Sequence, residues 1–298
     1  MLFRNFFRKI PRQTGVFVNA KKRLFFIFLV AMVPGLVGCT PAQGMRHLES
    51  HEIIQKDSCY NLVTYNIRVG AGRGGLLVPL TYLSSSENKL KRIVKAIESV
   101  DPDVIALQEV RGSAQAKFIA DSLNFNYVYL SHGDRRLEWG LALLSKFDIM
   151  EHYGKPIRRE KKNPRVGLVC TIDINNSHIT VVNVHYYLGD YDKQVCETMR
   201  FLKNAAGPVI LMGDLNLVDP DHGLSPIRKK LIDTCDAVDT QGSQEARQKG
   251  TFRFGSRRID YIFVEPNYFA VTDCGLAPKA YRDASDHIAY FACVTLKK

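Results

Sequence analysis

Polar side chains that can bind a metal or transfer a proton stand at the ends of short apolar runs in six parts of the chain. They are Asn66, Gln108 with Glu109, His185, Asp214 with Asn216, Asp260, and Asp286 with His287. A short apolar run predicts a buried strand, and a carboxylate at its end is costly to bury without a partner. Four carboxylates can share one site only if a cation or histidines offset their repulsion. Hard oxygen ligands without a thiolate favour Mg²⁺ or Mn²⁺.

This combination of groups suits the hydrolysis of phosphate esters. The reaction needs a water in line with the leaving oxygen, neutralisation of the phosphate oxygens and a proton for the leaving group. A metal would supply positive charge, and a histidine held by a carboxylate would transfer the proton. Taken singly, each residue has an ordinary explanation, with Glu109 as a helix N-terminal acid and Asp214 as a turn former, so their joint order carries the argument.

That order resembles the endonuclease/exonuclease/phosphatase superfamily, which includes pancreatic-type deoxyribonuclease, AP endonucleases, sphingomyelinases and inositol-polyphosphate phosphatases. The matching segments span nearly all of 59–298 and are YNIR at 65–68, DVIALQEVRGS at 103–113, VNVH at 182–185, LMGDLN at 211–216, RRIDYIFV at 257–264 and SDH at 285–287. The resemblance implies an α/β protein, a four-layer α/β/β/α sandwich of two mixed β-sheets flanked by helices.

The resemblance also implies a role for each catalytic position. Asp214 and Asn216 match the pair that orients the attacking water and holds the scissile phosphate. Asp260 matches the carboxylate that orients the general base, which is His287. His185 matches the histidine that donates to a phosphate oxygen or protonates the leaving group.

Metal and substrate positions follow from the same comparison. Glu109 resembles the principal metal carboxylate, with Asn66 beside it and Asp286 as a further ligand. The basic residues of these motifs, Arg68, Arg111 and Arg258, are predicted to bind substrate. Outside the motifs, His132 and the aromatic residues Trp139, Tyr186 and Tyr187 are the candidates to lie near the site, although aromatic residues beside strands are more often part of the core.

The elements that position these residues alternate between strand and helix signals from 59 onward. Helical spacing follows Ser84, which forms a capping-box signature with Glu87, and recurs over 114–123 and 192–203. Between and after these segments come β-rich runs, including three closing strands near 259–264, 269–274 and 288–295. Without an internal linker or repeat, this pattern predicts one catalytic domain over 59–298.

The formal net charge of +11 is concentrated at the N-terminus, where seven basic residues and no acid precede Cys39. The remaining +4 is too small to indicate nucleic-acid binding by itself. Basic residues, an apolar run and Leu36-Val37-Gly38-Cys39 form the order of a bacterial lipoprotein signal. We therefore expect a signal peptide at 1–38, a lipidated Cys39 and a tether over 39–58.

Such a signal predicts an exported, lipid-anchored protein, with Thr40 favouring the outer membrane if the host has two. An even number of cysteines, six, remains after Cys39 and permits up to three disulfides without fixing their pairing. Cys170 and Cys293 lie in apolar runs, where a buried free thiol is the alternative.

The motifs favour a monomeric, Mg²⁺-dependent DNase-type endonuclease, because 66–68 and 108–111 look like the secreted deoxyribonuclease branch. The segment 139–145 and the arrangement from Thr251 to Tyr261 look more like the superfamily's poorly defined bacterial hydrolases, which include lipid phosphodiesterases. The alternative is therefore a phospholipid or sphingolipid phosphodiesterase, or another phosphatase of the fold. The sequence between the motifs contains no evident apolar hairpin that would enter a bilayer. A non-catalytic surface binding protein belongs to a different functional class, and such a protein has no need of the full catalytic set.

Overall fold

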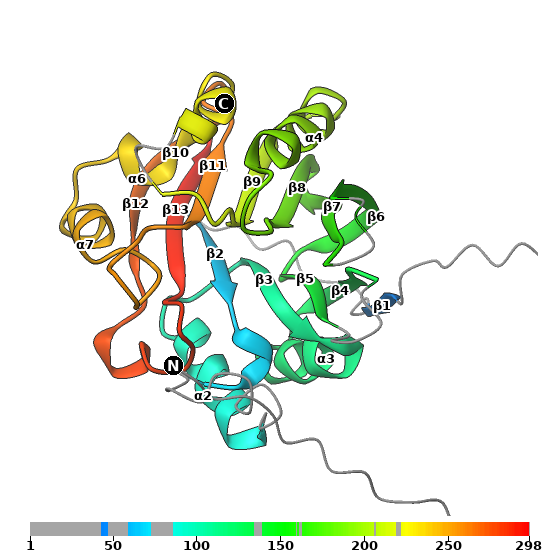
Figure 1. Ribbon diagram of the computed structural model, residues 1–298, viewed down its shortest axis with the longest axis vertical. Helices are drawn as coiled ribbons and strands as arrows, with labels where there is room; N and C mark the ends of the chain where they lie inside the picture. Colours follow the sequence, from blue (N-terminus) through cyan, green and yellow to red (C-terminus); the bar gives the residue numbers. More distant parts are fainter. Residues whose placement is uncertain are drawn as a thin grey trace, which may run out of the picture. The chain divides into compact units, whose positions relative to one another are not determined.

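The computed structural model describes residues 43–46, 59–72, 86–133, 139–158, 160, 163–205, 207–218 and 222–297. Two β-sheets form the centre of the molecule (Figure 1). One sheet contains, in spatial order, β1 (Gln43–Arg46), β4 (Asn126–Ser131), β5 (Trp139–Ser145), β3 (Val104–Arg111), β2 (Tyr60–Asn66), β13 (Tyr290–Leu296) and β12 (Phe269–Leu276). The other contains β10 (Ile232–Asp233), β11 (Asp260–Val264), β9 (Val209–Asp214), β8 (Ser177–His185), β7 (Arg165–Ile174) and β6 (Asp148–Arg158).

Both sheets are mixed, because β2 pairs with β3 and β8 pairs with β9 in parallel while the other pairs are antiparallel. Side chains on β8 and β9 alternate between two apolar clusters, as the two-residue period of a strand requires. Val181 and Met212 belong to the larger cluster, whereas Val182 and Leu211 belong to the cluster shared with α4 (Tyr191–Lys203). The six-stranded sheet is therefore covered on both faces.

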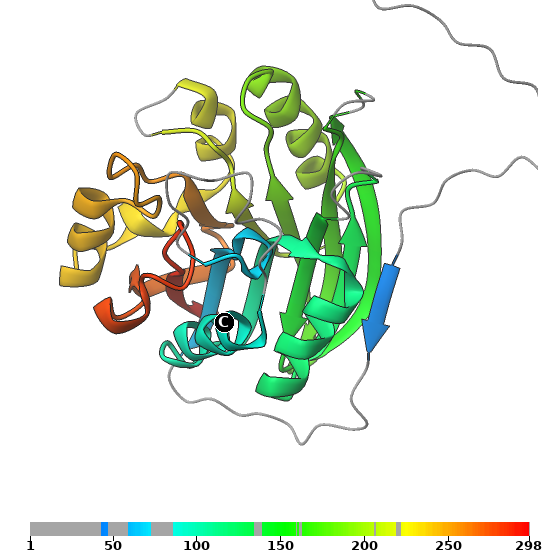
Figure 2. The same ribbon diagram turned by 60° about the horizontal axis from the view of Figure 1, so that its bottom comes forward.

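Helices cover the outer faces of the two sheets (Figure 2). Buried residues Ile93 and Ile97 of α2 (Glu87–Glu98) join the larger apolar cluster, as do Ala116 and Ile119 of α3 (Gly112–Leu123). The smaller helices are α5 (Ser225–Arg228), α6 (Thr234–Ala237) and α7 (Gln241–Lys249), with 3-10 turns η1 (Arg68–Gly70), η2 (His222–Leu224) and η3 (Lys279–Tyr281). This arrangement confirms the predicted sandwich.

Several elements differ from the sequence-based expectation. Residues 43–46, expected to be part of a tether, form strand β1 on the edge of the sheet. Strand β6 was not predicted, because most of its side chains are exposed and its apolar signal is weak. Ser86 rather than Ser84 caps α2, accepting a hydrogen bond from the Lys89 backbone; Ser84 lies outside the described residues, as do Cys39 and the predicted signal peptide.

Within the described parts of the chain, no helix has both the length and the apolar character needed to cross a bilayer.

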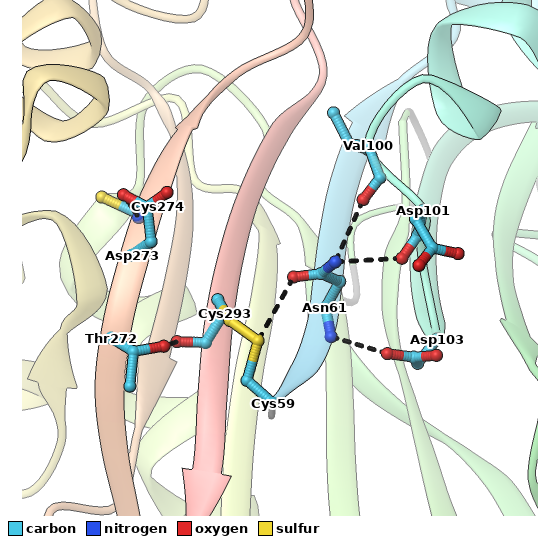
Figure 3. The surroundings of a disulfide bond; sticks show 9 residues. All are labelled: Cys59, Asn61, Val100, Asp101, Asp103, Thr272, Asp273, Cys274 and Cys293. Atoms are coloured by element: carbon cyan, nitrogen blue, oxygen red, sulfur yellow. Dashed lines mark hydrogen bonds between the residues drawn. A yellow bond between two sulfur atoms is a disulfide. The ribbon is translucent and has the colours of Figure 1, made fainter. Parts of the chain in front are cut away.

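A disulfide between Cys59 and Cys293 joins the start of β2 to β13, with a Cα–Cα distance of 5.7 Å (Figure 3). Among the other described cysteines, Cys170, Cys235 and Cys274 are buried free thiols and Cys196 is an exposed one. The expectation of a buried free thiol thus holds for Cys170 but not for Cys293. The bond connects residues that are 234 positions apart in the sequence.

Candidate active site

The predicted catalytic residues meet at one end of both sheets, which we call the catalytic end. His185 at the end of β8 lies beside Asp214 at the end of β9, because these strands are parallel and in register. Asp260 begins the antiparallel neighbour β11 directly opposite Asp214. Asn66 ends β2 beside Gln108 of β3 in the other sheet. The topology therefore brings Asn66 into contact with Asp214 although the two lie 148 positions apart.

A local distortion of β3 directs Glu109 into the site. The pairing of β3 with β5 is irregular between Leu107 and Val110, and Glu109 has a φ of 53°. This left-handed conformation is uncommon for a residue other than glycine and interrupts the alternation of side chains along a strand. As a result, Glu109 Oε1 accepts a hydrogen bond of 3.2 Å from Asn66 Nδ2.

Asp214 lies at the centre of the site. Its Oδ2 accepts a hydrogen bond of 3.0 Å from Asn66 Nδ2, and its Oδ1 accepts from the backbone of Asn216. The Nε2 atoms of His185 and His287 lie 3.6 Å and 3.7 Å from the same Oδ2. Two histidines and one amide therefore converge on a single carboxylate oxygen.

His287 is held by Asp260, whose Oδ2 lies 2.8 Å from the ring Nδ1. Thr251 Oγ1 in turn accepts hydrogen bonds from the backbone N–H groups of Ile259 and Asp260. The Phe252 ring lies 5.0 Å from the His287 ring. These contacts leave Nε2 as the ring nitrogen that faces Asp214.

Burial dominates the electrostatics of these groups. It raises the pKa of Glu109 to about 7, with Asp286 adding to the rise, and it also raises the pKa of Asp214, with help from Asp260. Burial opposes the charging of His287, but Asp260 and Asp214 prevail and raise its pKa to about 10. Burial and the charge of Arg165 lower the pKa of His185, which is neutral at pH 7.

The donor set fits a divalent cation. The carboxylate oxygens Glu109 Oε2 and Asp260 Oδ1 are buried without a hydrogen-bond partner, and ligand atoms of Asp214, Asp260 and His287 lie within 4.8 Å of one another. Burial raises the pKa values of Glu109 and Asp214, and the positive charge of a bound cation offsets this effect. Glu109 and Asn66 stand beside this group through their bonds to each other and to Asp214.

Asp286, predicted as a further metal ligand, lies next to this group but is engaged with Arg68. Its Oδ2 lies 3.2 Å from Arg68 Nε, and its Oδ1 accepts from Ser285 Oγ. Its negative charge contributes to the raised pKa of Glu109. The contact to Arg68 therefore makes Asp286 part of the electrostatic surroundings of Glu109.

Two of the arginines predicted to bind substrate, Arg68 and Arg258, are buried in ion pairs. Arg68 is 2% exposed, and besides Asp286 it donates to the carbonyl of Gly72. Arg258 is 5% exposed and donates to both oxygens of Asp233 at 3.0 Å and 2.7 Å. Buried guanidinium groups in such pairs support the fold around the site. Arg111 ends β3 and is partly exposed.

The structure adds Arg165, at the start of β7, to the site. Its guanidinium is 4% exposed and lies 5.2 Å from the Trp139 ring and 5.6 Å from the Tyr187 ring. Its charge acts on the pKa values of Glu109 and His185. No local pattern in the sequence distinguishes this arginine from the other basic residues of 155–165.

His132 also lies near the site, as the sequence suggested. Its ring is 6.1 Å from that of His185, and its Nδ1 accepts a hydrogen bond from the Val166 backbone. Below the site, the buried amide of Asn183 joins the sheets by donating to the Leu107 and Ala142 carbonyls and accepting from Gln108. This support was not predicted, because an amide inside an apolar strand carries no distinct signal.

Residues 63–287 match the model of the endonuclease/exonuclease/phosphatase family. The chain belongs to this family. Its members include phosphoric-ester hydrolases, and its enzymes generally depend on divalent metals.

Two curated relatives differ in substrate. Inositol phosphosphingolipids phospholipase C of Saccharomyces cerevisiae is 27% identical over 255 residues, covering 65% of this chain and 52% of the relative. Exodeoxyribonuclease III of Haemophilus influenzae is 25% identical over 150 residues, covering 45% and 55%. The chain spans about half the length of these relatives.

Among solved structures, a conserved protein of unknown function from Enterococcus faecalis V583 superimposes with a TM-score of 0.66 at 20% identity. The match covers 80% of this chain and 100% of that one, and it shows a shared fold.

Proposed function

We propose that the chain is an exported, Mg²⁺-dependent phosphodiesterase. The observation that carries this proposal is the convergence of His185, His287 and Asn66 on one oxygen of Asp214, with His287 fixed by Asp260. A binding module does not need a buried histidine oriented by a carboxylate beside a set of metal donors.

The residues divide the proton transfers between two histidines. Asp260 accepts a hydrogen bond from His287 Nδ1, so the neutral ring presents Nε2 as the acceptor of a proton from the attacking water. His185 is neutral, and its Nε2 donates to a phosphate oxygen or gives a proton to the leaving oxygen. Arg165 contributes positive charge near the phosphate.

Glu109, Asn66 and Asp214 are the residues that would hold Mg²⁺, with Asp286 contributing charge nearby. When bound, the metal supplies positive charge that offsets the phosphate oxygens and the developing charge of the leaving group. Positive charge held at Glu109 and Asp214 would offset the contribution of Asp214 to the raised pKa of His287 and bring that pKa closer to the range of a general base.

Two classes of phosphodiester, DNA and a lipid, are candidate substrates. The resemblance of 66–68 and 108–111 to secreted deoxyribonucleases favours DNA. The phosphosphingolipid relative, which matches the larger share of the chain, favours a lipid phosphodiester. Both reactions attack a phosphodiester with the same groups, so residues around the site decide between them.

Export and lipid anchoring at Cys39 are part of the proposal. The Cys59–Cys293 disulfide supports export, because disulfides persist in oxidising compartments. Acylation would fix the chain, as a monomer, to a bacterial membrane, the outer one if the host has two. Metabolic labelling with palmitate tests the anchor, since the label should be lost in Cys39→Ala and its persistence would refute lipidation there.

The activity is tested with the purified full-length protein and Mg²⁺ on plasmid DNA, sphingomyelin vesicles, an inositol phosphate and bis(p-nitrophenyl) phosphate. We expect hydrolysis of the soluble diester, loss with EDTA and recovery with Mg²⁺. Glu109→Gln and His287→Ala should each lower the rate by about two orders of magnitude or more. Full activity in either variant would exclude this site assignment.

A further inference from the structure

Strand β1 enters its sheet at the catalytic end. The register places Gln43 opposite Leu130 and Arg46 opposite Tyr127. Leu130 lies just before His132, whose ring is 6.1 Å from the ring of His185. Arg46 donates to the carbonyl of Phe125, near the other end of β4. Strand β1, blue in Figure 2, therefore begins at the catalytic end and runs away from it along the sheet edge.

This register limits how far the catalytic end can be from a lipid anchor. Cys39 precedes Gln43 by four positions, and four residues of fully extended chain span at most about 14 Å. Acyl chains on Cys39 would thus hold the catalytic end close to the bilayer surface.

Exposed apolar side chains occupy the loops that leave this same end. Leu188 follows His185 by three positions and is 63% exposed; Val218 follows Asn216 and is 38% exposed. Phe254 is 54% exposed at the tip of the hairpin that the Phe252–Arg257 bridge closes. We call these three residues the apolar loop residues. The sequence showed no evident apolar hairpin between the motifs, but these loops expose apolar side chains at the catalytic end.

Contacts among the loops fix them around the site. Asn216 Nδ2 donates to the Tyr186 carbonyl, which links the loop of Val218 to the loop of Leu188. Phe252 forms a backbone bridge with His287, and its ring contacts the Phe254 ring at 5.5 Å. The three apolar loop residues therefore extend from elements that hold catalytic groups.

The character of the apolar loop residues favours a lipid over a polynucleotide. Bases stack on aromatic rings, but two of these side chains are aliphatic and offer no such platform. Apolar side chains combined with nearby cations are typical of surfaces that enter the headgroup region of a membrane. The hairpin supplies the cation, because the exposed Arg257 guanidinium lies 4.9 Å from the Phe252 ring.

We infer that the catalytic end faces the membrane that carries the protein and that Leu188, Val218 and Phe254 contact its lipid surface. The substrate is then the phosphodiester of a lipid headgroup in that surface. This inference rests on the proposed phosphodiesterase activity and the proposed anchor at Cys39.

The orientation can be measured without any activity. The acylated protein, which begins at Cys39, is reconstituted into phosphatidylcholine–phosphatidylglycerol vesicles with brominated acyl chains, which quench nearby tryptophan. Phe254→Trp is compared with Tyr268→Trp, an exposed position at the opposite end, where Phe269 pairs with Leu296. The single native tryptophan, Trp139, gives the same background in both. We expect strong quenching at 254 and little at 268; equal quenching, or stronger quenching at 268, would overturn the orientation.

The lipid contact is tested by substituting serine at positions 188, 218 and 254 together. Hydrolysis of sphingomyelin in vesicles should fall at least about tenfold, while hydrolysis of soluble bis(p-nitrophenyl) phosphate stays within about twofold. The matched control carries serine at Met150 and Tyr268, which are 55% and 45% exposed away from the site, and should behave like the parent. Unchanged vesicle hydrolysis, or a selective loss of DNA cleavage, would refute the lipid contact.

Failure of the underlying proposals gives different results. If the parent hydrolyses no phosphodiester, the proposed function fails, whereas the quenching comparison still decides the orientation. If Cys39→Ala stays bound to vesicles as the parent does, the anchor is unnecessary. In that case, serine at positions 188, 218 and 254 is added to Cys39→Ala. Loss of vesicle binding in this variant would support a lipid contact of the apolar loop residues, and unchanged vesicle binding would refute that contact.

Discussion

The imidazole Nδ1 of His287 lies 2.8 Å from Oδ2 of Asp260, and both residues are buried beside Asp214. This pair fixes which ring nitrogen faces the reacting groups. It also stores a proton in the metal-free protein, because Asp260 and Asp214 outweigh burial and raise the pKa of His287 to about 10. Positive charge bound at these carboxylates would lower the pKa of His287 toward the range of a general base.

Replacement of Asp260 by Asn should lower kcat by roughly three orders of magnitude, because an amide no longer fixes the tautomer or stabilises the charged ring. His287→Ala should cost as much, and the double variant should cost little more than either single one, since the two residues act as a unit. Steady-state kinetics with bis(p-nitrophenyl) phosphate measures the effect. If the fold-loss of kcat in the double variant equalled the product of the two single losses, the two residues would act separately.

In EDTA, Glu109 and His287 should each make the free energy of unfolding fall as the pH rises. His132 and His185, whose pKa values burial lowers, act in the opposite direction below about pH 6.5. Folding raises the pKa of Glu109 from 4.5 to about 7, so the stabilisation it gives is complete below 4.5 and is lost as the pH rises through 7. His287, raised from 6.5 to about 10, loses its contribution between those values. Thermal unfolding in EDTA at several pH values measures this trend.

Glu109→Gln should make that fall shallower, because the amide does not titrate. In the parent, Mg²⁺ should raise the Tm more at about pH 8 than at about pH 6, since binding requires the ionised carboxylate. A Mg²⁺ effect of the same size in Glu109→Gln would show that the metal binds elsewhere. The Tm is a readout independent of turnover.

The sequence predicted most of the fold and the catalytic positions, because those positions end strands with strong apolar signals. Asp214 and Asn216 follow the apolar run 209–212, and His185 follows a similar run. Parallel strand pairs then place such ends together without further information. Their roles in catalysis remain predictions that the variants above test.

The ion-pair partners of the arginine side chains, and the extent of their burial, could not be predicted from local sequence. Arg68 and Arg258 lie in the motifs, yet their side chains are buried against Asp286 and Asp233, the latter in a different segment of the chain. Strand β1 forms because a short polar segment completes a sheet edge, a tertiary interaction that leaves no period in the sequence. Glu109 owes its direction to a backbone irregularity that residue types do not reveal.

Substitution of Arg165 by Met should lower kcat/KM about a hundredfold while the Tm changes little. The side chain is enclosed by Trp139 and Tyr187, so Met retains the packing but removes the charge. Arg165→Lys should recover part of the activity, because it restores the charge without the planar group. An unchanged kcat/KM in Arg165→Met would remove this residue from the site.

Loss of the Cys59–Cys293 disulfide should lower the free energy of unfolding by about 2–5 kcal/mol. The bond closes a long stretch of chain and fastens β2, which carries Asn66, to β13. Cys59→Ser, Cys293→Ser and the double variant should be equally destabilised in urea unfolding. Cys196→Ser, at an exposed free thiol, is the matched control and should have no effect.

Arg258 should prove to be a structural residue when it is replaced. Its guanidinium and Asp233 form a buried pair with two hydrogen bonds, so Arg258→Met leaves the buried carboxylate with Arg228 as its remaining arginine partner and should cost about 3–5 kcal/mol. Adding Asp233→Leu removes the carboxylate, and the double variant should regain much of the stability. Arg258 lies two positions before Asp260, so loss of the fold around Arg258 should also lower kcat. In the double variant, kcat should recover together with the stability, while KM remains close to that of the parent. A raised KM in a stable double variant would instead return Arg258 to the substrate-binding role that the sequence predicted.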